Sequence, residues 1–225
     1  MSLDAVDRPV HVYFPAEGAE YVERLLGCTP FRRAVEVVCH PVPGDGTVDE
    51  VAGATLSARR LDHGMPTLGW RLDEPGGRRM LPDRLAALGV RGAAVGRLSR
   101  EGSLDVDGRL VSLDEVSAPR PGQSFAFVMD TRECAGAEAL VERTDLAVCE
   151  ATFLHRDADL ADAYGHLTAA RAARLAAAGG ARRLVLTHFS QRYPDPADYA
   201  GEAEPLFPGV HVAADLDRVP VPPRR

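Results

Sequence analysis

Residues 182–193 read R-R-L-V-L-T-H-F-S-Q-R-Y and place a short apolar run directly before a set of polar side chains. The run 184–186 follows the glycine pair 179–180, which typically ends a helix, so we expect a buried strand here. In open α/β sheets, ligands bind beyond the carboxyl ends of the strands. His188 therefore either faces a functional site or only caps the strand by bonding a backbone carbonyl. This stretch alone leaves both interpretations open.

Two other predicted strands end in acidic residues. Residues 124–129, S-F-A-F-V-M, form the clearest buried strand and precede Asp130, and the strand over 145–148 leads to Glu150. A carboxylate at the tip of an apolar strand is costly unless it is paired, hydrogen-bonded or bound to a metal. Both acids therefore become candidates for a site at the strand ends.

Two more histidines lie where functional residues are common. His63 lies in a turn marked by glycine and proline, and His166 lies at the start of a predicted helix with Thr168 as its N-cap. A turn histidine can equally well face solvent. Histidine nitrogen and aspartate oxygen suit Zn²⁺ or Mn²⁺. Taken together, the strand-end residues favour a metal or acid–base site, whose candidate members are His63, Asp130, Glu150, His166 and His188.

The rest of the chain alternates strand and helix patterns, which predicts an α/β fold. A helix over 16–26 should turn Tyr21, Leu25 and Leu26 inward, and Asp107-Gly108 indicates a hairpin turn. The remaining expected strands are 9–14, 34–42, 51–60, 67–72, 104–106, 109–111 and 210–213, and the remaining expected helices are 81–88, 157–180 (interrupted near 164–168) and 196–204.

The composition restricts the class of protein. Apolar residues make up 45% and charged residues 26%, as in soluble globular proteins. No apolar run reaches the ~20 residues of a membrane helix, and no signal peptide or C-x-x-C spacing is present, which favours a reducing cytoplasm. The net charge is −7 and all 26 cationic side chains are arginine, so a general nucleic-acid binder with a broad basic face is excluded. Local arginines remain suited to phosphate.

Residues 89–102, G-V-R-G-A-A-V-G-R-L-S-R-E-G, carry Arg91, Arg97 and Arg100 among glycines and little apolar content. We expect an exposed, flexible arm within a single domain over 1–225. The arm either contacts a phosphate backbone or is an ordinary solvated loop.

The ordered motifs D-H-G-M-P-T-L-G-W-R, F-V-M-D-T-R, C-E-A-T-F, Y-G-H-L-T and L-T-H-F-S-Q-R-Y resemble ribonuclease Z, over about residues 9–220. That family belongs to the metallo-β-lactamase superfamily and removes 3′ trailers from precursor transfer RNA. The resemblance implies an αββα four-layer sandwich, two zinc ions, a precursor tRNA partner and a homodimer in which one subunit's arm serves the other subunit's site.

The resemblance also implies roles for individual residues. His63 would complete the first zinc site, Asp130 would bridge the ions, and His188 would complete the second site. Glu150 would orient His166 for proton handling or phosphate stabilisation. Phosphate contacts would come from Ser190 and Arg192, and the arm that contacts the tRNA elbow would include Arg97 and Arg100.

Several positions depart from the family pattern. The H-x-H-x-D-H motif, which supplies four zinc ligands, is absent from this sequence, so we expect an N-terminally incomplete fold with impaired catalysis. Cys149 stands in place of a histidine, Leu167 in place of a serine, and the arm lacks the family's Pro-Gly-Pro and lysine features. Two alternatives remain. One is another hydrolase of the superfamily, of arylsulfatase or cyclic-nucleotide phosphodiesterase type, and the other is a metal-poor, non-catalytic relative.

Overall fold

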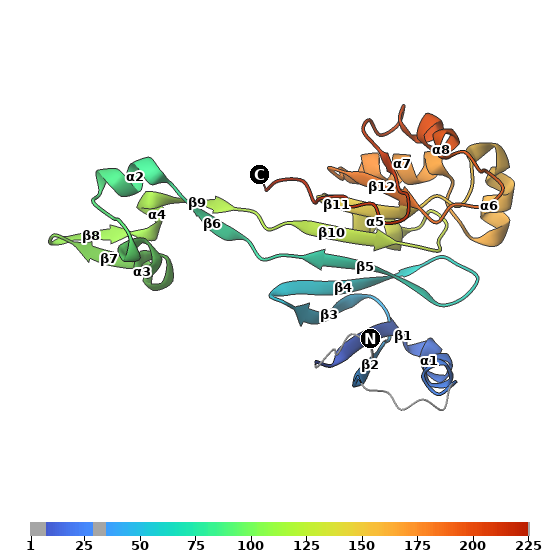
Figure 1. Ribbon diagram of the computed structural model, residues 1–225, viewed down its shortest axis with the longest axis horizontal. Coiled ribbons are helices and arrows are strands. Elements are labelled where there is room, and N and C mark those ends of the chain that lie inside the picture. Colours follow the sequence, from blue (N-terminus) through green and yellow to red (C-terminus); the bar gives the residue numbers. More distant parts are fainter. Residues whose placement is uncertain (1–7, 29–34, 225) are drawn as a thin grey trace. The chain divides into compact units, whose positions relative to one another are not determined.

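A seven-stranded sheet forms the centre of the larger part of the molecule (Figure 1). The structure is a computed structural model that describes residues 8–28 and 35–224. Six of the seven strands are close to those predicted, because each is a short run of β-forming residues bounded by turn residues. The strand over 46–51 was not predicted. In order across the sheet the strands are β13 (His211–Val212), β12 (Leu184–Thr187), β11 (Leu146–Glu150), β10 (Ser124–Val128), β5 (Thr67–Asp73), β4 (Ala54–Leu61) and β3 (Gly46–Val51).

The parallel half of this sheet determines where the polar strand ends lie. Strands β10, β11, β12 and β13 run parallel, whereas β5 runs antiparallel to β10. Val128 pairs with Cys149, and Glu150 pairs with Thr187. The carboxyl ends of β10, β11 and β12 therefore lie side by side at one edge, which is the expected location of a ligand site.

Helices pack on this sheet through small apolar residues. Ala126, Ala173 and Leu186 belong to the main core and are fully buried. Thr168 caps α7 as predicted, because its side-chain oxygen accepts a hydrogen bond from the Arg171 amide at 3.2 Å. In the described part of the chain, no helix is both long and apolar enough to cross a lipid bilayer. The elements of this region are α5 (Ala135–Val141), η2 (His155–Asp157), α6 (Ala158–Tyr164), α7 (Ala169–Gly179) and α8 (Pro196–Ala203).

A second, two-stranded parallel sheet is formed by β1 (Val10–Pro15) and β2 (Val37–Val42). Because side chains alternate along a strand, Tyr13 and Val42 face one side and pack with Leu68 and Trp70 of β5. Phe14 faces the other side, where it lines a groove with residues of α1 (Ala19–Leu26), which follows η1 (Ala16–Gly18). The order helix, sheet, sheet, helix confirms the expected four layers.

The predicted inward face of α1 is partly wrong. Tyr21 and Leu25 are 69% and 70% exposed, whereas Val22 and Leu26 line the groove against β1 and β2. The apolar residues of α1 cover more of its circumference than one packed face, and the pattern alone does not say which of them turns inward.

Residues 74–123 form a separate compact unit with its own core. The expected loop over 89–102 is wrong in its secondary structure, because Ala93–Glu101 is a helix and Leu98 is fully buried. Gly92 and Gly102 take positive φ angles of 55° and 78° at the two ends of this helix, so they bound it rather than fill a loop. The elements of the unit are β6 (Gly77–Met80), α2 (Pro82–Ala87), α3 (Ala93–Glu101), β7 (Ser103–Val106), β8 (Arg109–Ser112), α4 (Leu113–Val116) and β9 (Ser117–Arg120); β7 and β8 form the predicted hairpin.

Candidate active site

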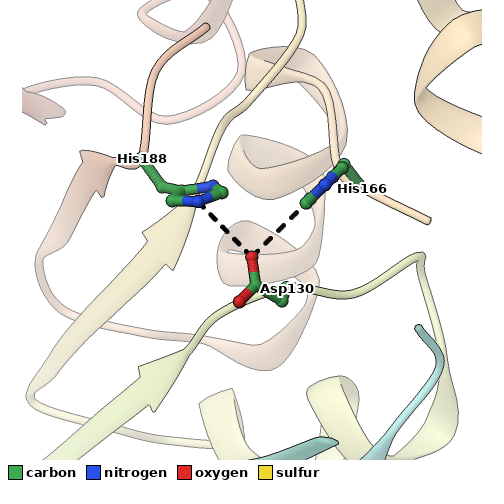
Figure 2. Close-up of side chains that lie close together, drawn as sticks. All are labelled: Asp130, His166 and His188. Carbon is green, nitrogen blue, oxygen red and sulfur yellow. Dashed lines mark ion pairs between the residues drawn. The ribbon is translucent and has the colours of Figure 1, made fainter. Parts of the chain in front are cut away.

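Asp130, His166 and His188 meet beyond the carboxyl ends of the parallel strands. Asp130 comes after β10, His188 comes directly after β12, and His166 arrives from the segment before α7. One potential ligand atom from each residue lies within 4.8 Å of the others (Figure 2). The structure therefore brings together residues that are far apart in the sequence.

Asp130 lies between the two imidazoles. Its Oδ1 atom is 3.4 Å from Nε2 of His188 and 3.9 Å from Nδ1 of His166. Asp130 and His188 also have positive φ angles, 55° and 60°. Such backbone conformations cost energy for residues other than glycine and gather at functional sites. Both residues therefore carry a local backbone cost at the place where their side chains meet.

Glu150 is fully buried at the end of β11, and each of its hydrogen-bonding partners is a donor or can act as one. Its Oε1 atom accepts from the Thr131 amide at 2.6 Å and lies 3.0 Å from Nδ1 of His166. Its Oε2 atom accepts from the Thr152 hydroxyl at 2.6 Å. A buried carboxylate surrounded by donors acts as an acceptor throughout, so the Nδ1 atom of His166 carries its proton toward Glu150.

The hydrogen bond to Glu150 raises the pKa of His166 above its ordinary value. Burial opposes this change, and the nearby charges of Glu150 and Asp130 add to it. The pair therefore stabilises the protonated imidazole, which is the form that can donate a proton. The contact between Glu150 and His166 is the one that the expected acid–base pair requires, and its role in catalysis stays a prediction.

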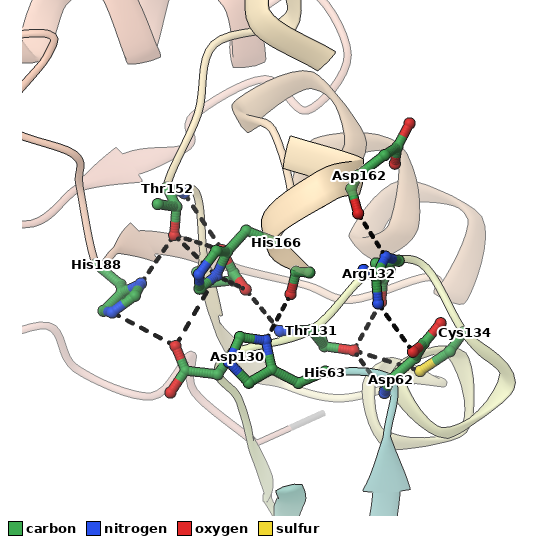
Figure 3. Close-up of polar contacts among 12 residues, drawn as sticks. Asp62, His63, Asp130, Thr131, Arg132, Cys134, Thr152, Asp162, His166 and His188 are labelled. Atoms are coloured by element: carbon green, nitrogen blue, oxygen red, sulfur yellow. Dashed lines mark hydrogen bonds and ion pairs between the residues drawn. The ribbon is translucent and has the colours of Figure 1, made fainter. Parts of the chain in front are cut away.

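Hydrogen bonds between two loops hold His63 beside this cluster (Figure 3). The amide of Asp62 donates to the Thr131 hydroxyl at 3.1 Å, and the Arg132 amide donates to the Asp62 carbonyl at 2.8 Å. The guanidinium of Arg132 reaches the Asp62 carboxylate at 3.1 Å and the Asp162 carbonyl at 2.8 Å. The loop after β4 is thereby fixed to the loop after β10 and to α6.

The His63 ring itself is oriented by Gly165. Its Nδ1 atom lies 2.9 Å from the Gly165 carbonyl, which can only accept, so Nδ1 carries the proton and Nε2 keeps a free lone pair. The His63 and His166 ring centres are 5.0 Å apart. The backbone contact of a ring nitrogen is the usual way in which a metal-binding histidine is oriented.

The donor set fits a divalent metal ion. An aspartate oxygen and imidazole nitrogens that converge within 4.8 Å are ligands of the type that Zn²⁺ takes in proteins. Asp130 and His188 would hold the ion. His63 is not a member of the cluster of converging ligand atoms, so its role as a further ligand stays a prediction. His166 contributes an atom to the same cluster, although its Nδ1 is engaged with Glu150.

The residues predicted to bind phosphate lie in two places. Ser190 and Arg192 follow β12 in the loop that carries His188, and the Ser190 amide donates to the Thr152 carbonyl at 3.1 Å. Arg97 and Arg100 lie on α3 in the other unit, where both are exposed and Arg97 pairs with Glu101 at 3.5 Å. Their contact with a substrate stays a prediction.

The two departures from the family pattern near the site are core residues. Cys149 and Leu167 are fully buried and belong to the main core. Neither contributes to the cluster of Asp130, His166 and His188. The two departures therefore affect the packing beneath the site, and the neighbouring Glu150 and His166 are still present.

Thr152 is a residue of this site that was not among those predicted from the sequence. Its hydroxyl lies 2.6 Å from Oε2 of Glu150 and 2.8 Å from Nδ1 of His188 (Figure 3). The only signal was its position two residues after Glu150 in C-E-A-T-F, where a threonine carries no chemistry of its own that would single it out.

Comparisons with known proteins identify the family of this chain. A model described as the beta-lactamase superfamily domain matches residues 114–189. Ribonuclease Z of Nocardia farcinica is 55% identical over 227 residues, which cover 100% of this chain and 74% of that protein. Ribonuclease Z of Streptomyces coelicolor is 50% identical over 100% of this chain and 74% of its own length, and that of Chlamydia pneumoniae is 37% identical over 99% and 72%.

Solved structures show the same fold. The short form of human tRNase Z matches with a TM-score of 0.60 and 20% identity, over 96% of this chain and 70% of that one. The metallo-β-lactamase fold protein YhfI of Bacillus subtilis matches with a TM-score of 0.59 and 16% identity, over 91% and 62%. From its sequence relatives and its fold, this chain belongs to the ribonuclease Z family and has an α/β metallo-β-lactamase fold.

Proposed function

We propose that this chain is an endoribonuclease of tRNA 3′ processing that hydrolyses a phosphodiester bond to remove the 3′ trailer of precursor tRNA. The observation that carries the proposal is the convergence of Asp130, His166 and His188 around a buried glutamate. Family membership supports it, because the relatives that match the whole chain are ribonuclease Z proteins.

We assign the metal site to His63, Asp130 and His188, with zinc as the resident ion. When bound, such an ion polarises a phosphoryl oxygen and lowers the pKa of a coordinated water. The remaining chemistry belongs to the chain. Water forms the new bond to phosphorus and loses a proton to solvent, while His166 donates a proton to the oxygen that leaves; Glu150 holds the imidazole in the required orientation.

Substrate contacts are assigned to the two arginine-bearing regions. Ser190 and Arg192 would contact phosphate beside the site, and Arg97 and Arg100 would contact the RNA backbone farther from the scissile bond. The resemblance further supports a homodimer that acts in the cytoplasm. Four free cysteines are compatible with a reducing compartment.

The test is cleavage of a precursor tRNA with a 3′ trailer by the zinc-supplemented protein, with zinc content measured on the same samples. Because the H-x-H-x-D-H motif is absent from this sequence, wild-type protein should release the trailer slowly, and Asp130→Ala should abolish this remaining cleavage and lower the zinc content. His211→Asn is the matched control, because His211 pairs with Asp217 at 2.8 Å on β13, away from the cluster. Zinc-loaded wild-type protein that leaves the precursor intact would favour the non-catalytic alternative instead.

A further inference from the structure

The side chain of Thr152 contacts three of the residues that were predicted to form the site. It is partly buried in the loop after β11. Its hydroxyl lies 2.6 Å from Oε2 of Glu150, 2.8 Å from Nδ1 of His188 and 3.4 Å from Nδ1 of His166. Its carbonyl accepts from the Ser190 amide at 3.1 Å, so its backbone also joins the loops after β11 and β12.

Counting protons determines the direction of these hydrogen bonds. A threonine hydroxyl has one hydrogen and two lone pairs. The carboxylate of Glu150 accepts at both oxygens, so the hydroxyl hydrogen points to Oε2, where the distance of 2.6 Å is that of a charge-assisted bond. The oxygen of Thr152 can then only accept from His188, and the Nδ1 atom of His188 must carry the proton.

The result for His188 is a single neutral tautomer. With the proton on Nδ1, the Nε2 atom keeps its lone pair, and this atom lies 3.4 Å from Oδ1 of Asp130 in the cluster (Figure 3). A metal ion needs an unprotonated imidazole nitrogen, so the tautomer decides whether His188 can act as a ligand on this side.

We propose that Thr152 is a positioning residue that connects the buried Glu150 carboxylate to His188 and fixes the Nδ1–H tautomer, so that Nε2 faces the metal site. One carboxylate then orients two imidazoles, His166 by direct contact and His188 through the hydroxyl. Threonine suits this role because its branched Cβ restricts χ1 and holds the hydroxyl in one direction. This inference rests on the metal site of the proposed function but not on its RNA substrate.

The experiment compares Thr152→Val, which keeps the side-chain shape without the hydroxyl, with Thr152→Ser, which keeps the hydroxyl. The first measurement is the side-chain nitrogen NMR spectrum of metal-free protein at a pH where the imidazoles are neutral. Signals of His188 are assigned by their absence in His188→Asn. Wild-type protein and Thr152→Ser should show the Nδ1–H form of His188, and Thr152→Val should show a mixture with the Nε2–H form.

The second measurement is Zn²⁺ affinity by competition with a chelator. Thr152→Val should bind Zn²⁺ roughly 10–100-fold more weakly, as is typical for lost partners of metal ligands, and Thr152→Ser should restore most of this loss. Thr55→Val is the matched control, because it removes a hydroxyl that donates to the exposed Glu50 at 2.7 Å, away from the cluster; it should leave both readouts unchanged.

The inference is overturned if wild-type His188 is in the Nε2–H form, or if Thr152→Val leaves the tautomer and the Zn²⁺ affinity unchanged. The tautomer of His188 in wild-type protein tests the inference without any variant, so the test still works if Thr152→Val fails to fold. Neither readout involves RNA. If the tautomer shifts as expected but precursor tRNA is not cleaved, the proposed function fails and the role of Thr152 stands.

Discussion

The carbonyl oxygen of Gly165 lies 2.9 Å from Nδ1 of His63 and joins two loops that are 102 positions apart in the sequence. Only glycine fits this contact without a change in the loop. Gly165 has a φ angle of 81°, and an added Cβ atom would lie 2.8 Å from the same His63 nitrogen. The orientation of His63 therefore depends on a residue that has no side chain.

Gly165→Ala should displace His63 and weaken metal binding. Alanine at this φ angle costs roughly 1–2 kcal/mol, and the clash with the His63 ring adds to that cost. Gly180→Ala is the matched control, since Gly180 has a φ angle of 70° but no atom within 4 Å of the added Cβ. Thermal unfolding should show a loss in both variants, whereas Zn²⁺ affinity should fall only in Gly165→Ala. Equal affinity in the two variants would contradict the role assigned to His63.

Glu150→Gln should disrupt the site more than its small change in shape suggests. The amide group cannot accept at both ends, so a buried donor of Thr131, Thr152 or His166 loses its partner, at a cost of roughly 1–3 kcal/mol. Cleavage should fall at least about 100-fold, in line with typical contributions of acid–base pairs. Glu202→Gln is the control, because Glu202 also accepts backbone hydrogen bonds, from His155 at 2.6 Å and Ala170 at 2.9 Å, but on α8. Full activity in Glu150→Gln would remove Glu150 from the mechanism.

The stabilising effect of the Glu150–His166 pair should decline with rising pH. Because the pKa of His166 is raised in the folded protein, its contribution is fully present below the ordinary value of 6.5 and is lost as pH rises through the folded value. Asp130 strengthens this effect and Arg132 opposes it. Denaturant unfolding of metal-free wild type and His166→Asn should therefore differ most at low pH, and a difference that grows above neutral pH would contradict the assigned charge.

The sequence predicts most of the sheet and the residues at its strand ends. The strands 124–128, 146–150 and 184–187 are short, mostly apolar runs. A polar side chain at or just beyond the end of each run, namely Asp130, Glu150 and His188, indicates a site because such a residue is costly to bury without a partner. Asp130 and His188 could be found because a parallel sheet aligns the ends of its strands, even when the strands are far apart in the sequence.

What the sequence does not predict depends on tertiary contacts. Helix α3 was missed because glycines and arginines give a weak local pattern, and Leu98 provides its buried anchor only once the hairpin β7–β8 is in place. Thr152 was missed for a different reason. Its importance comes from distances to Glu150 and His188, and no residue type or spacing encodes those distances.

Native-state thiol labelling should distinguish the core cysteine from the exposed ones. Burial raises the pKa of the Cys149 thiol to about 12, and the charge of Glu150 adds to this effect. Cys28 and Cys39 are exposed. Alkylation near pH 8 should therefore modify Cys28 and Cys39, and Cys149 should react only after unfolding, as mass spectrometry of tryptic peptides would show. Rapid labelling of Cys149 in folded protein would contradict its placement in the core.

Arg182→Met should destabilise the protein more than the loss of an exposed pair does, because it leaves the largely buried Asp145 without the Arg182 cation. Asp145 is 8% exposed and lies 2.6 Å from the Arg182 guanidinium, and it accepts from the Ser124 amide at 2.9 Å. Removing one partner of a fully buried pair typically costs about 3–5 kcal/mol, and the cost here should lie below that range because the Arg182 side chain is 25% exposed. Arg24→Met is the control, since Arg24 and Glu20 form a pair whose side chains are 69% and 65% exposed, and such pairs contribute at most about 1 kcal/mol.

The difference in stability between wild type and Arg182→Met should also depend on pH. Burial raises the pKa of Asp145, but the hydrogen bonds from Arg182 and Ser124 outweigh it, so the folded pKa is lowered. The stability from this pair is present above the ordinary value of 3.8 and is lost as pH falls through the folded value. The difference in unfolding free energy between wild type and Arg182→Met should therefore be constant near neutral pH and shrink in acid. A difference that does not shrink in acid would mean that Arg182 acts through packing and not through its charge on Asp145.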